Sequence, residues 1–173
     1  MKTITILQRK NTPIGTIYVA ASKIGLVRVD LCDSQTMTQS DQYASQPDIP
    51  HDIAFKALEE ISDYLTKKRT RFTIPLDWSD QTPFQKRVLE IALMIPFGEV
   101  MTYGEIAHQL GNKNASRAVG AALGQNPMPL VIPCHRVVAA NGSLTGFSAA
   151  DGIRTKQWLL ELEGHQVVAQ KLV

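Results

Sequence analysis

The hydrophobic pattern of the chain changes once, near residues 77–80, and this change constrains the fold more than any other feature. Before it, apolar and polar residues largely alternate, as in Leu26–Leu31, which is typical of half-buried β-strands. After it, apolar residues recur three and four positions apart, as at Val88, Ile91 and Ile95, which is typical of amphipathic helices. A chain of 173 residues that is 44% hydrophobic is long enough for two small domains. We predict an α/β (α+β) protein with a strand-rich domain over 1–76 and a mostly helical domain over 77–173.

The first domain is predicted to hold a small antiparallel sheet and one helix. The expected elements are a hairpin over 4–21 that turns at Asn11-Thr12-Pro13, a strand Leu26–Leu31, a loop over 33–50, a helix from Ile53 to Leu65 and a strand Phe72–Leu76. The basic run 67–71 follows the helix. It fits a solvated helix end, where the helix dipole favours positive charge, better than a DNA contact.

The second domain contains the pattern of a helix-turn-helix. Thr82-Pro83 begins one helix, and Thr102 with Glu105 forms a capping-box pattern before a helix over Tyr103–Leu110. A polar turn follows, and Ser116 is expected to cap a helix over 117–123. Two helices joined by a four-residue turn match the layout of a DNA-binding motif, although any helical hairpin looks similar. Further on, Asn141-Gly142 predicts a hairpin turn that links a strand over Val137–Ala139 to one over Leu144–Gly146, and a final helix is expected from Ile153 to Leu162.

Charge and cysteine content exclude several classes of protein. The formal net charge is +2, so a nucleic-acid surface must be a local patch rather than the whole molecule. No acidic residue lies between Glu105 and Asp151, which suits a polyanion but equally suits a mostly apolar core segment. Cys32 and Cys134 are the only cysteines, which excludes a disulfide scaffold and a four-cysteine zinc site and fits a reducing cytosol. No secretory signal or membrane segment is expected, so we predict a cytoplasmic protein.

The segment Pro133–Val138 is the most informative for chemistry. A cysteine thiolate is the strongest nucleophile among side chains, and it needs a base or a positive field to form near neutral pH. His135 follows Cys134 directly, but neighbouring side chains rarely point the same way, so proton transfer through a water molecule is favoured. Glu163 is a candidate to hold the imidazole in one tautomer. From chemistry alone, a structural buried thiol with a core histidine is an equally good interpretation.

A set of motifs that follow one another along the chain favours the nucleophilic interpretation of Cys134 over the structural one. The sequence Pro133-Cys134-His135-Arg136-Val137 resembles the active-site signature of the O6-alkylguanine-DNA alkyltransferases, the methylated-DNA–protein-cysteine methyltransferases. The resemblance extends over about residues 82–165 and is loose over 1–76. Its segments are 82–85, 95–100, 102–103, 115–120, 126–127, 132–138, 141–142, 145–147, Lys156, 158–160 and 162–164.

The resemblance implies a specific reaction. Members of the family flip the damaged guanine (or thymine) out of the duplex and transfer its alkyl group to the cysteine, once per molecule and without a cofactor or metal. Cys134 would be the acceptor, and His135 would take its proton through a water molecule with Glu163 orienting the ring. Asn126 would fix the active-site turn. Tyr103 would assist base flipping and donate to the guanine.

The resemblance also implies a DNA-binding face and a substrate pocket. Arg117 would fill the space that the flipped base leaves. The DNA-binding set is Arg117, Thr102, Tyr103, Ser116, Ala118 and Arg136, and the pocket set is Val137, Phe147, Ser148 and Ala149. The family also implies a ribonuclease-H-like N-terminal domain, double-stranded DNA as partner and a monomer.

Two features depart from the family pattern, and other functions compete. Phe147 stands where a tyrosine is frequent, and Ala149-Ala150 stand where many members have two glycines, with Asp151-Gly152 as a short insertion. The competing functions are a non-catalytic alkyl-lesion sensor, a helix-turn-helix transcription factor and a cysteine hydrolase. The sensor is disfavoured because Cys134 is retained, the transcription factor because no dimerisation segment is visible, and the hydrolase because it has no use for Arg117.

Overall fold

The computed structural model describes residues 3–32 and 49–173. The chain forms two compact units, Met1–Asp80 and Gln81–Val173. Of the predicted loop 33–50, residues 33–48 lie outside the described residues. The predicted domain boundary between residues 76 and 77 stays a prediction. In the structure, Asp77 groups with the first unit, since its backbone N–H donates to Leu26 O and its buried carboxylate accepts from Ser22 Oγ.

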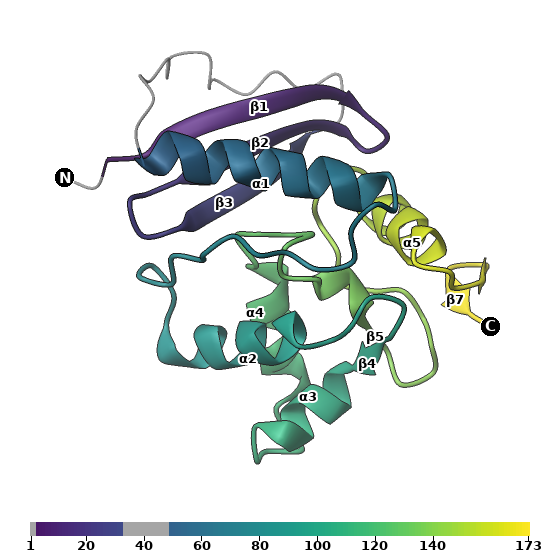
Figure 1. Cartoon of the computed structure of the whole chain (residues 1–173). Helices are drawn as coiled ribbons and strands as arrows, with labels where there is room; N and C mark the ends of the chain where they lie inside the picture. Colours follow the sequence, from purple (N-terminus) through teal and green to yellow (C-terminus); the bar gives the residue numbers. More distant parts are fainter. Residues whose placement is uncertain (1–2, 33–48) are drawn as a thin grey trace. The chain divides into compact units, whose positions relative to one another are not determined.

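The first unit is a three-stranded antiparallel sheet with one helix against it (Figure 1). Its elements are β1 (Thr5–Thr12), β2 (Gly15–Ala21), β3 (Leu26–Cys32) and α1 (Ile49–Leu65). The predicted β1–β2 hairpin is confirmed, but its turn is Pro13-Ile14 rather than Asn11-Thr12-Pro13, because β1 continues to Thr12, which pairs with Gly15. Gly15 (φ 94°) takes the left-handed conformation that closes the turn. The fully buried Ile17 and Leu26 of the sheet and Ile61 and Tyr64 of α1 form its core.

One predicted strand of this unit does not form. Phe72–Leu76 pairs only through a single parallel bridge between Leu76 and Leu26. The segment approaches the sheet closely at Gly25, where an added Cβ would lie 2.6 Å from Pro75 O. Sequence alternation alone predicted a strand here, but backbone hydrogen bonding to Leu26 ends after one residue pair.

The second unit contains the helices α2 to α5, a short 3-10 helix and short strand pairs, and Figure 1 shows its helices. Its elements are α2 (Pro83–Leu93), β4 (Met101–Thr102), α3 (Tyr103–Gln109), α4 (Ser116–Gly124), the 3-10 helix η1 (Cys134–Arg136), β5 (Val137–Val138), α5 (Ile153–Leu162), β6 (Val167–Val168) and β7 (Lys171–Leu172). Capping boxes at Thr82 and Thr102 confirm two predicted helix starts. Helices α3 and α4 pack together as the predicted helix-turn-helix, and α2 packs on α4.

Two local predictions in this unit were wrong. The N-cap of α4 is Ala115 without a side-chain cap bond, and Ser116 is the first helical residue. The turn at Asn141-Gly142 forms, but Leu144–Gly146 is not a strand. Instead, Leu144 N–H donates to Gln170 O and Ser143 bridges to Lys171, so this segment pairs with the C-terminal hairpin. Strand β5 pairs in parallel with β4, with Met101 opposite Val137.

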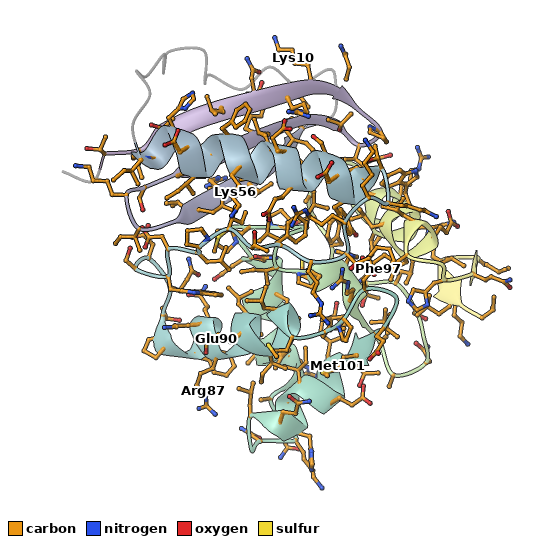
Figure 2. The ribbon with its side chains drawn as sticks, viewed as in Figure 1. Lys10, Lys56, Arg87, Glu90, Phe97 and Met101 are labelled. Atoms are coloured by element: carbon orange, nitrogen blue, oxygen red, sulfur yellow. The ribbon has the colours of Figure 1, made fainter. Side chains whose placement is uncertain are left out.

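The surface of the second unit has a hollow of about 320 Å³ between α2 and α3. Arg87 and Glu90 extend from α2 at its edge (Figure 2). Its other lining residues are Ile91, Met94, Gln109 and Leu110, none of which is a predicted site residue. Over residues 3–32 and 49–173, no helix has the length and apolar character needed to cross a membrane.

Candidate active site

Cys134 is the first residue of the 3-10 helix η1 and directly follows Pro133. Cys134 is buried, with 7% of its surface exposed. Its backbone N–H donates to Ile132 O at 2.8 Å, which makes a tight turn before the helix. Strand β5 follows η1 and pairs with β4, and α3 begins immediately after β4. The sheet pairing therefore links the cysteine turn to the first helix of the helix-turn-helix.

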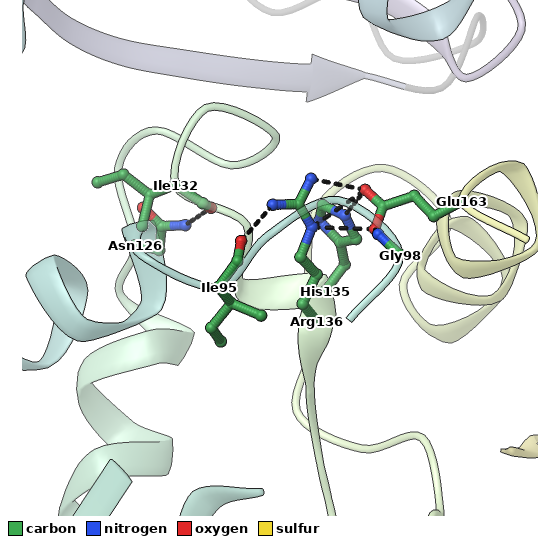
Figure 3. Close-up of polar contacts among 7 residues, drawn as sticks. All are labelled: Ile95, Gly98, Asn126, Ile132, His135, Arg136 and Glu163. Carbon is green, nitrogen blue, oxygen red and sulfur yellow. Dashed lines mark hydrogen bonds and ion pairs between the residues drawn. The ribbon is translucent and has the colours of Figure 1, made fainter. Parts of the chain in front are cut away.

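Asn126 holds this turn in place. Its Nδ2 donates to Ile132 O at 2.9 Å (Figure 3). The same Nδ2 donates to Cys134 Sγ at 3.2 Å, and Oδ1 accepts from Met128 N at 3.0 Å. The amide thus fixes the turn and directs a donor at the sulfur. An N–H aimed at sulfur favours the thiolate over the thiol.

His135, Arg136 and Glu163 form a buried network at the other end of η1 (Figure 3). His135 Nε2 lies 3.0 Å from Glu163 Oε1. The guanidinium of Arg136 contacts both carboxylate oxygens, with Nε 2.9 Å from Oε2 and Nη2 2.8 Å from Oε1. Gly98 N also donates to Oε2, at 3.1 Å. Glu163 follows α5 as its C-cap, so the loop at Gly98, the cysteine turn and α5 meet at one carboxylate.

The network determines the protonation states of Glu163 and His135. Burial alone would raise the pKa of Glu163, but hydrogen bonds and charges from His135 and Arg136 hold that pKa well below its usual range. Burial lowers the pKa of His135, and Glu163 acts in the opposite direction. Because an ionised carboxylate only accepts, Nε2 carries the proton toward Glu163 and Nδ1 is the basic nitrogen.

Lys156 is a buried residue of the site that sequence reasoning left without a role. It is fully buried on α5, and its Nζ donates to Val137 O at 2.6 Å and to Thr145 O at 2.7 Å. Burial lowers the pKa of Lys156 to about 8, and the neighbouring Cys134 acts in the opposite direction. Burial also raises the pKa of the Cys134 thiol, while Asn126 and the Lys156 charge oppose that rise. A lysine within an apolar helix face is the signal that could have identified it.

Tyr103 begins α3 and contacts the segment after the Asn141-Gly142 turn. Its hydroxyl donates to Thr145 O at 2.9 Å, the carbonyl that also accepts from Lys156. Burial raises the pKa of Tyr103, so the hydroxyl keeps its proton at neutral pH. Gly146 (φ 69°) lies so close that an added Cβ would be 2.6 Å from the Tyr103 hydroxyl oxygen.

The predicted DNA-binding residues divide into two groups. Arg117 and Ala118 are exposed on the first turn of α4, next to half-buried Ser116, and Thr102 lies half-buried before α3. Arg136 does not belong with them, because it is 5% exposed and its Nη1 donates to Ile95 O at 2.6 Å. We therefore remove Arg136 from the DNA-binding set and assign it to the buried network.

The predicted pocket residues lie in or close to the two segments whose carbonyls, Val137 O and Thr145 O, accept from Lys156 Nζ. Val137 is buried, and its carbonyl accepts from Lys156. Phe147 is buried, Ser148 is exposed, and Ala149 is half-buried with its carbonyl accepting from Gly152 N at 3.0 Å. Ala150 adopts a left-handed conformation (φ 48°), which costs a non-glycine residue energy. Within the described parts of the chain, no three His, Cys, Asp or Glu residues gather as a metal site.

The fold and the site together define a helix-turn-helix protein with a buried nucleophilic cysteine. Residues 4–78 match the family description "6-O-methylguanine DNA methyltransferase, ribonuclease-like domain", and residues 83–165 match its "DNA binding domain". The chain belongs to the methylated-DNA–protein-cysteine methyltransferase family.

Individual relatives agree with this assignment. The chain is 38% identical over 159 residues to a methylated-DNA–protein-cysteine methyltransferase of Mycobacterium leprae, covering 91% of this chain and 92% of the relative. It is 36% identical to the crystal structure of O6-methylguanine methyltransferase of Mycobacterium tuberculosis, with a TM-score of 0.78 and 96% of each chain covered. A structure of the Mycobacterium tuberculosis OGT in complex with DNA matches over 92% of each chain at 36% identity, with a TM-score of 0.76.

Proposed function

We propose that this protein repairs DNA by moving the alkyl group of an O6-alkylguanine onto Cys134, in a single irreversible turnover. The observation that carries the proposal is the buried Cys134 Sγ, which receives an N–H from Asn126 in a domain that also holds a helix-turn-helix. In the reaction, the sulfur lone pair forms a new S–C bond while the C–O6 bond breaks. The guanine leaves with the electron pair and takes up a proton.

His135 would accept the thiol proton through a water molecule. Nε2 is committed to Glu163 at 3.0 Å, which directs the basic Nδ1 away from the carboxylate. Asn126 and Lys156 would stabilise the sulfur anion, Asn126 by its N–H and Lys156 by its charge. A thioether is a poor leaving group, so one molecule would repair one lesion and then remain alkylated.

The departing guanine develops negative charge at O6, and donors around the pocket would stabilise it. The Tyr103 hydroxyl, which would turn from Thr145 O to the base, and the backbone near Ser148 are the proposed donors. Phe147 and Ala149 would form the apolar wall around the alkyl group. The carbonyls of Cys134 and Val137 would accept from the guanine amino group.

The lesion would reach Cys134 by base flipping, because the alkylated base is inaccessible inside the stack. Arg117 is exposed at the start of α4, where it would replace the extruded base. Ser116, Ala118, Thr102 and Tyr103 would contact the DNA around it. We further propose that the protein acts as a monomer in the cytoplasm on double-stranded DNA, and that O4-alkylthymine is a second substrate.

The intact mass of the protein tests this proposal after mixing with a duplex that carries one O6-methylguanine. We expect a gain of one methyl group per chain in the wild type and in Cys32→Ala, and no gain in Cys134→Ala. Cys32 is a suitable control because it is the other cysteine of the chain. Tight binding to the lesion duplex without any mass gain would instead establish the lesion-sensor function.

A further inference from the structure

The carboxylate of Glu163 is shared between two different partners on η1. Arg136 approaches it as a fork, with Nε and Nη2 on the carboxylate, and its third nitrogen, Nη1, is held by Ile95 O at 2.6 Å. His135 Nε2 approaches Oε1 at 3.0 Å, the same oxygen that Arg136 Nη2 contacts at 2.8 Å. All three side chains are almost completely removed from solvent.

The fork fixes the direction of the carboxylate. A guanidinium bound to both oxygens allows one plane and one rotamer, which a single hydrogen bond does not. Gly98 N occupies Oε2 from the loop after α2. Oε1 is thereby held toward His135, and the imidazole can donate to it only through Nε2.

The fork also changes the charge that His135 experiences. A buried carboxylate with no cation beside it would favour the imidazolium, which has no basic nitrogen. The charged groups that act on His135 are the anion Glu163 and the cations Arg136 and Lys156, and both cations oppose its protonation. Cys134, the residue before it on η1, is a further titratable neighbour.

We propose that Arg136 is a positioning residue for alkyl transfer: it orients Glu163 toward His135 and offsets the carboxylate charge, so that His135 remains a neutral base. The inference rests on the proposed role of His135 as the base. It assigns to Arg136 a role distinct from DNA binding and from stability alone. If the ion pair between Arg136 and Glu163 only stabilised the fold, Glu163 Oε1 would not need to contact His135 as well.

The test is to follow the ring nitrogens of His135 by ¹⁵N NMR as a function of pH in four proteins. They are the wild type, Arg136→Met, the double variant Arg136→Met/Glu163→Gln and the control Arg154→Met. Arg154 is a suitable control because it is exposed and its ion pair among the described residues is with exposed Asp151. In Arg136→Met we expect the pKa of His135 to rise by about one unit or more, since one nearby positive charge is lost. In the double variant, where the carboxylate charge is also gone, we expect it to return to the wild-type value or below.

Single-turnover methyl transfer gives a second readout. The acid limb of its pH profile should move to higher pH in Arg136→Met and move back in the double variant. If Arg136→Met does not fold, Arg136→Lys replaces it: it keeps the charge but loses the fork, so the rate should fall at every pH while the pKa of His135 stays near that of the wild type.

The outcomes separate this inference from the proposed function. An unchanged His135 titration in folded Arg136→Met, or a wild-type transfer rate in Arg136→Lys, would overturn the role of Arg136. A wild-type protein that never methylates Cys134 would overturn the proposed function, yet the NMR titration would still decide how Arg136 acts on His135.

Discussion

Asn126 is the residue on which the geometry of the nucleophile depends most directly. One amide binds Ile132 O, Cys134 Sγ and Met128 N, so it joins the end of α4 to the cysteine turn. Removing it leaves two backbone groups and the sulfur without these partners. Both the stability of the turn and the reactivity of the thiol therefore depend on the same side chain.

Replacing Asn126 by Ala should lower stability by about 1–3 kcal/mol, the range for leaving partly buried polar groups unpaired. The rate of methyl transfer should fall by about tenfold or more, because the donor to the thiolate is lost. Urea unfolding and single-turnover kinetics measure the two effects. Asn112→Ala is the matched control, since Asn112 is exposed and its side-chain oxygen accepts from Asn114 N in a surface turn. Equal rates in the two variants would contradict the role of Asn126.

Glu163 should make the protein sensitive to acid. Its pKa is held below the usual range in the folded state and returns to about 4.5 on unfolding, so its stabilisation is full above that pH. That contribution is lost as the pH falls through and below 4.5, and we estimate it at about 1–3 kcal/mol. Glu163→Gln should flatten the fall in unfolding free energy between about pH 5 and 3, measured by urea titration.

The acid sensitivity due to Glu163 is compared with that of a control variant and distinguished from the contribution of His135. Glu161→Gln, on the exposed side of α5, should keep the wild-type acid profile. His135 contributes a separate loss below its ordinary pKa of 6.5, because the unfolded imidazole takes up a proton that the buried one resists. A Glu163→Gln profile identical to the wild type below pH 5 would contradict the prediction.

Among structural elements, the segment after β5 determines where Tyr103 points. Thr145 O accepts from both Tyr103 and Lys156, and Gly146 leaves room for the tyrosine hydroxyl. Backbone bonds from Leu144 to Gln170 and from Leu172 to Gly142 hold this segment against the C-terminal hairpin. The element therefore connects the helix-turn-helix to α5 through its backbone.

Gly146→Ala tests this connection. Both Gly146 and Gly111 have a positive φ, so either substitution to Ala should cost about 1 kcal/mol of backbone strain. Only at Gly146 would the new Cβ collide with the Tyr103 hydroxyl, whereas nothing lies within 4 Å at Gly111. We expect methyl transfer to slow by about tenfold or more in Gly146→Ala and to stay unchanged in Gly111→Ala. A rate in Gly146→Ala that matches Gly111→Ala would show that the position of Tyr103 does not limit the reaction.

Elements that depend on local residue types were predictable, and those that depend on distant pairing were not. The helix starts at Thr82 and Thr102 are encoded within four residues and were predicted correctly, the second of them as a capping box. The parallel pairing of β4 with β5, and of Leu144 with Gln170, joins segments that no local pattern relates. The same limit applies in the site. The motif indicated Cys134 and His135, but adjacency in sequence did not reveal that Arg136 turns inward to Glu163.

At the scale of the whole molecule, the two parts of the chain differ in net charge. Residues 1–81 carry ten basic and ten acidic residues, while 82–173 carry eight basic and six acidic ones, so the net charge of +2 belongs to the second part. All proposed catalytic and DNA-binding residues also lie there. Its compactness means that a chemical change at Cys134 is felt by packed neighbours.

Alkylation of Cys134 should therefore destabilise the protein. An added methyl group in a close-packed site costs about 1–3 kcal/mol, which corresponds to a decrease in Tm of several degrees. Thermal unfolding of the protein before and after reaction with O6-methylguanine DNA measures the effect. Cys134→Ala treated with the same DNA should show no change, and an unchanged Tm in the fully methylated wild type would contradict the prediction.

The burial of Cys134 also affects how long an unreacted molecule keeps a thiol that can accept an alkyl group. The thiol of a residue that is only 7% exposed is poorly accessible to peroxide and to small disulfides, which attack cysteines on open surfaces. For a protein that would react only once, each copy lost to oxidation would be one lesion left in the genome. Enclosing the sulfur would therefore keep a waiting population of molecules intact until damaged DNA delivers the alkyl group.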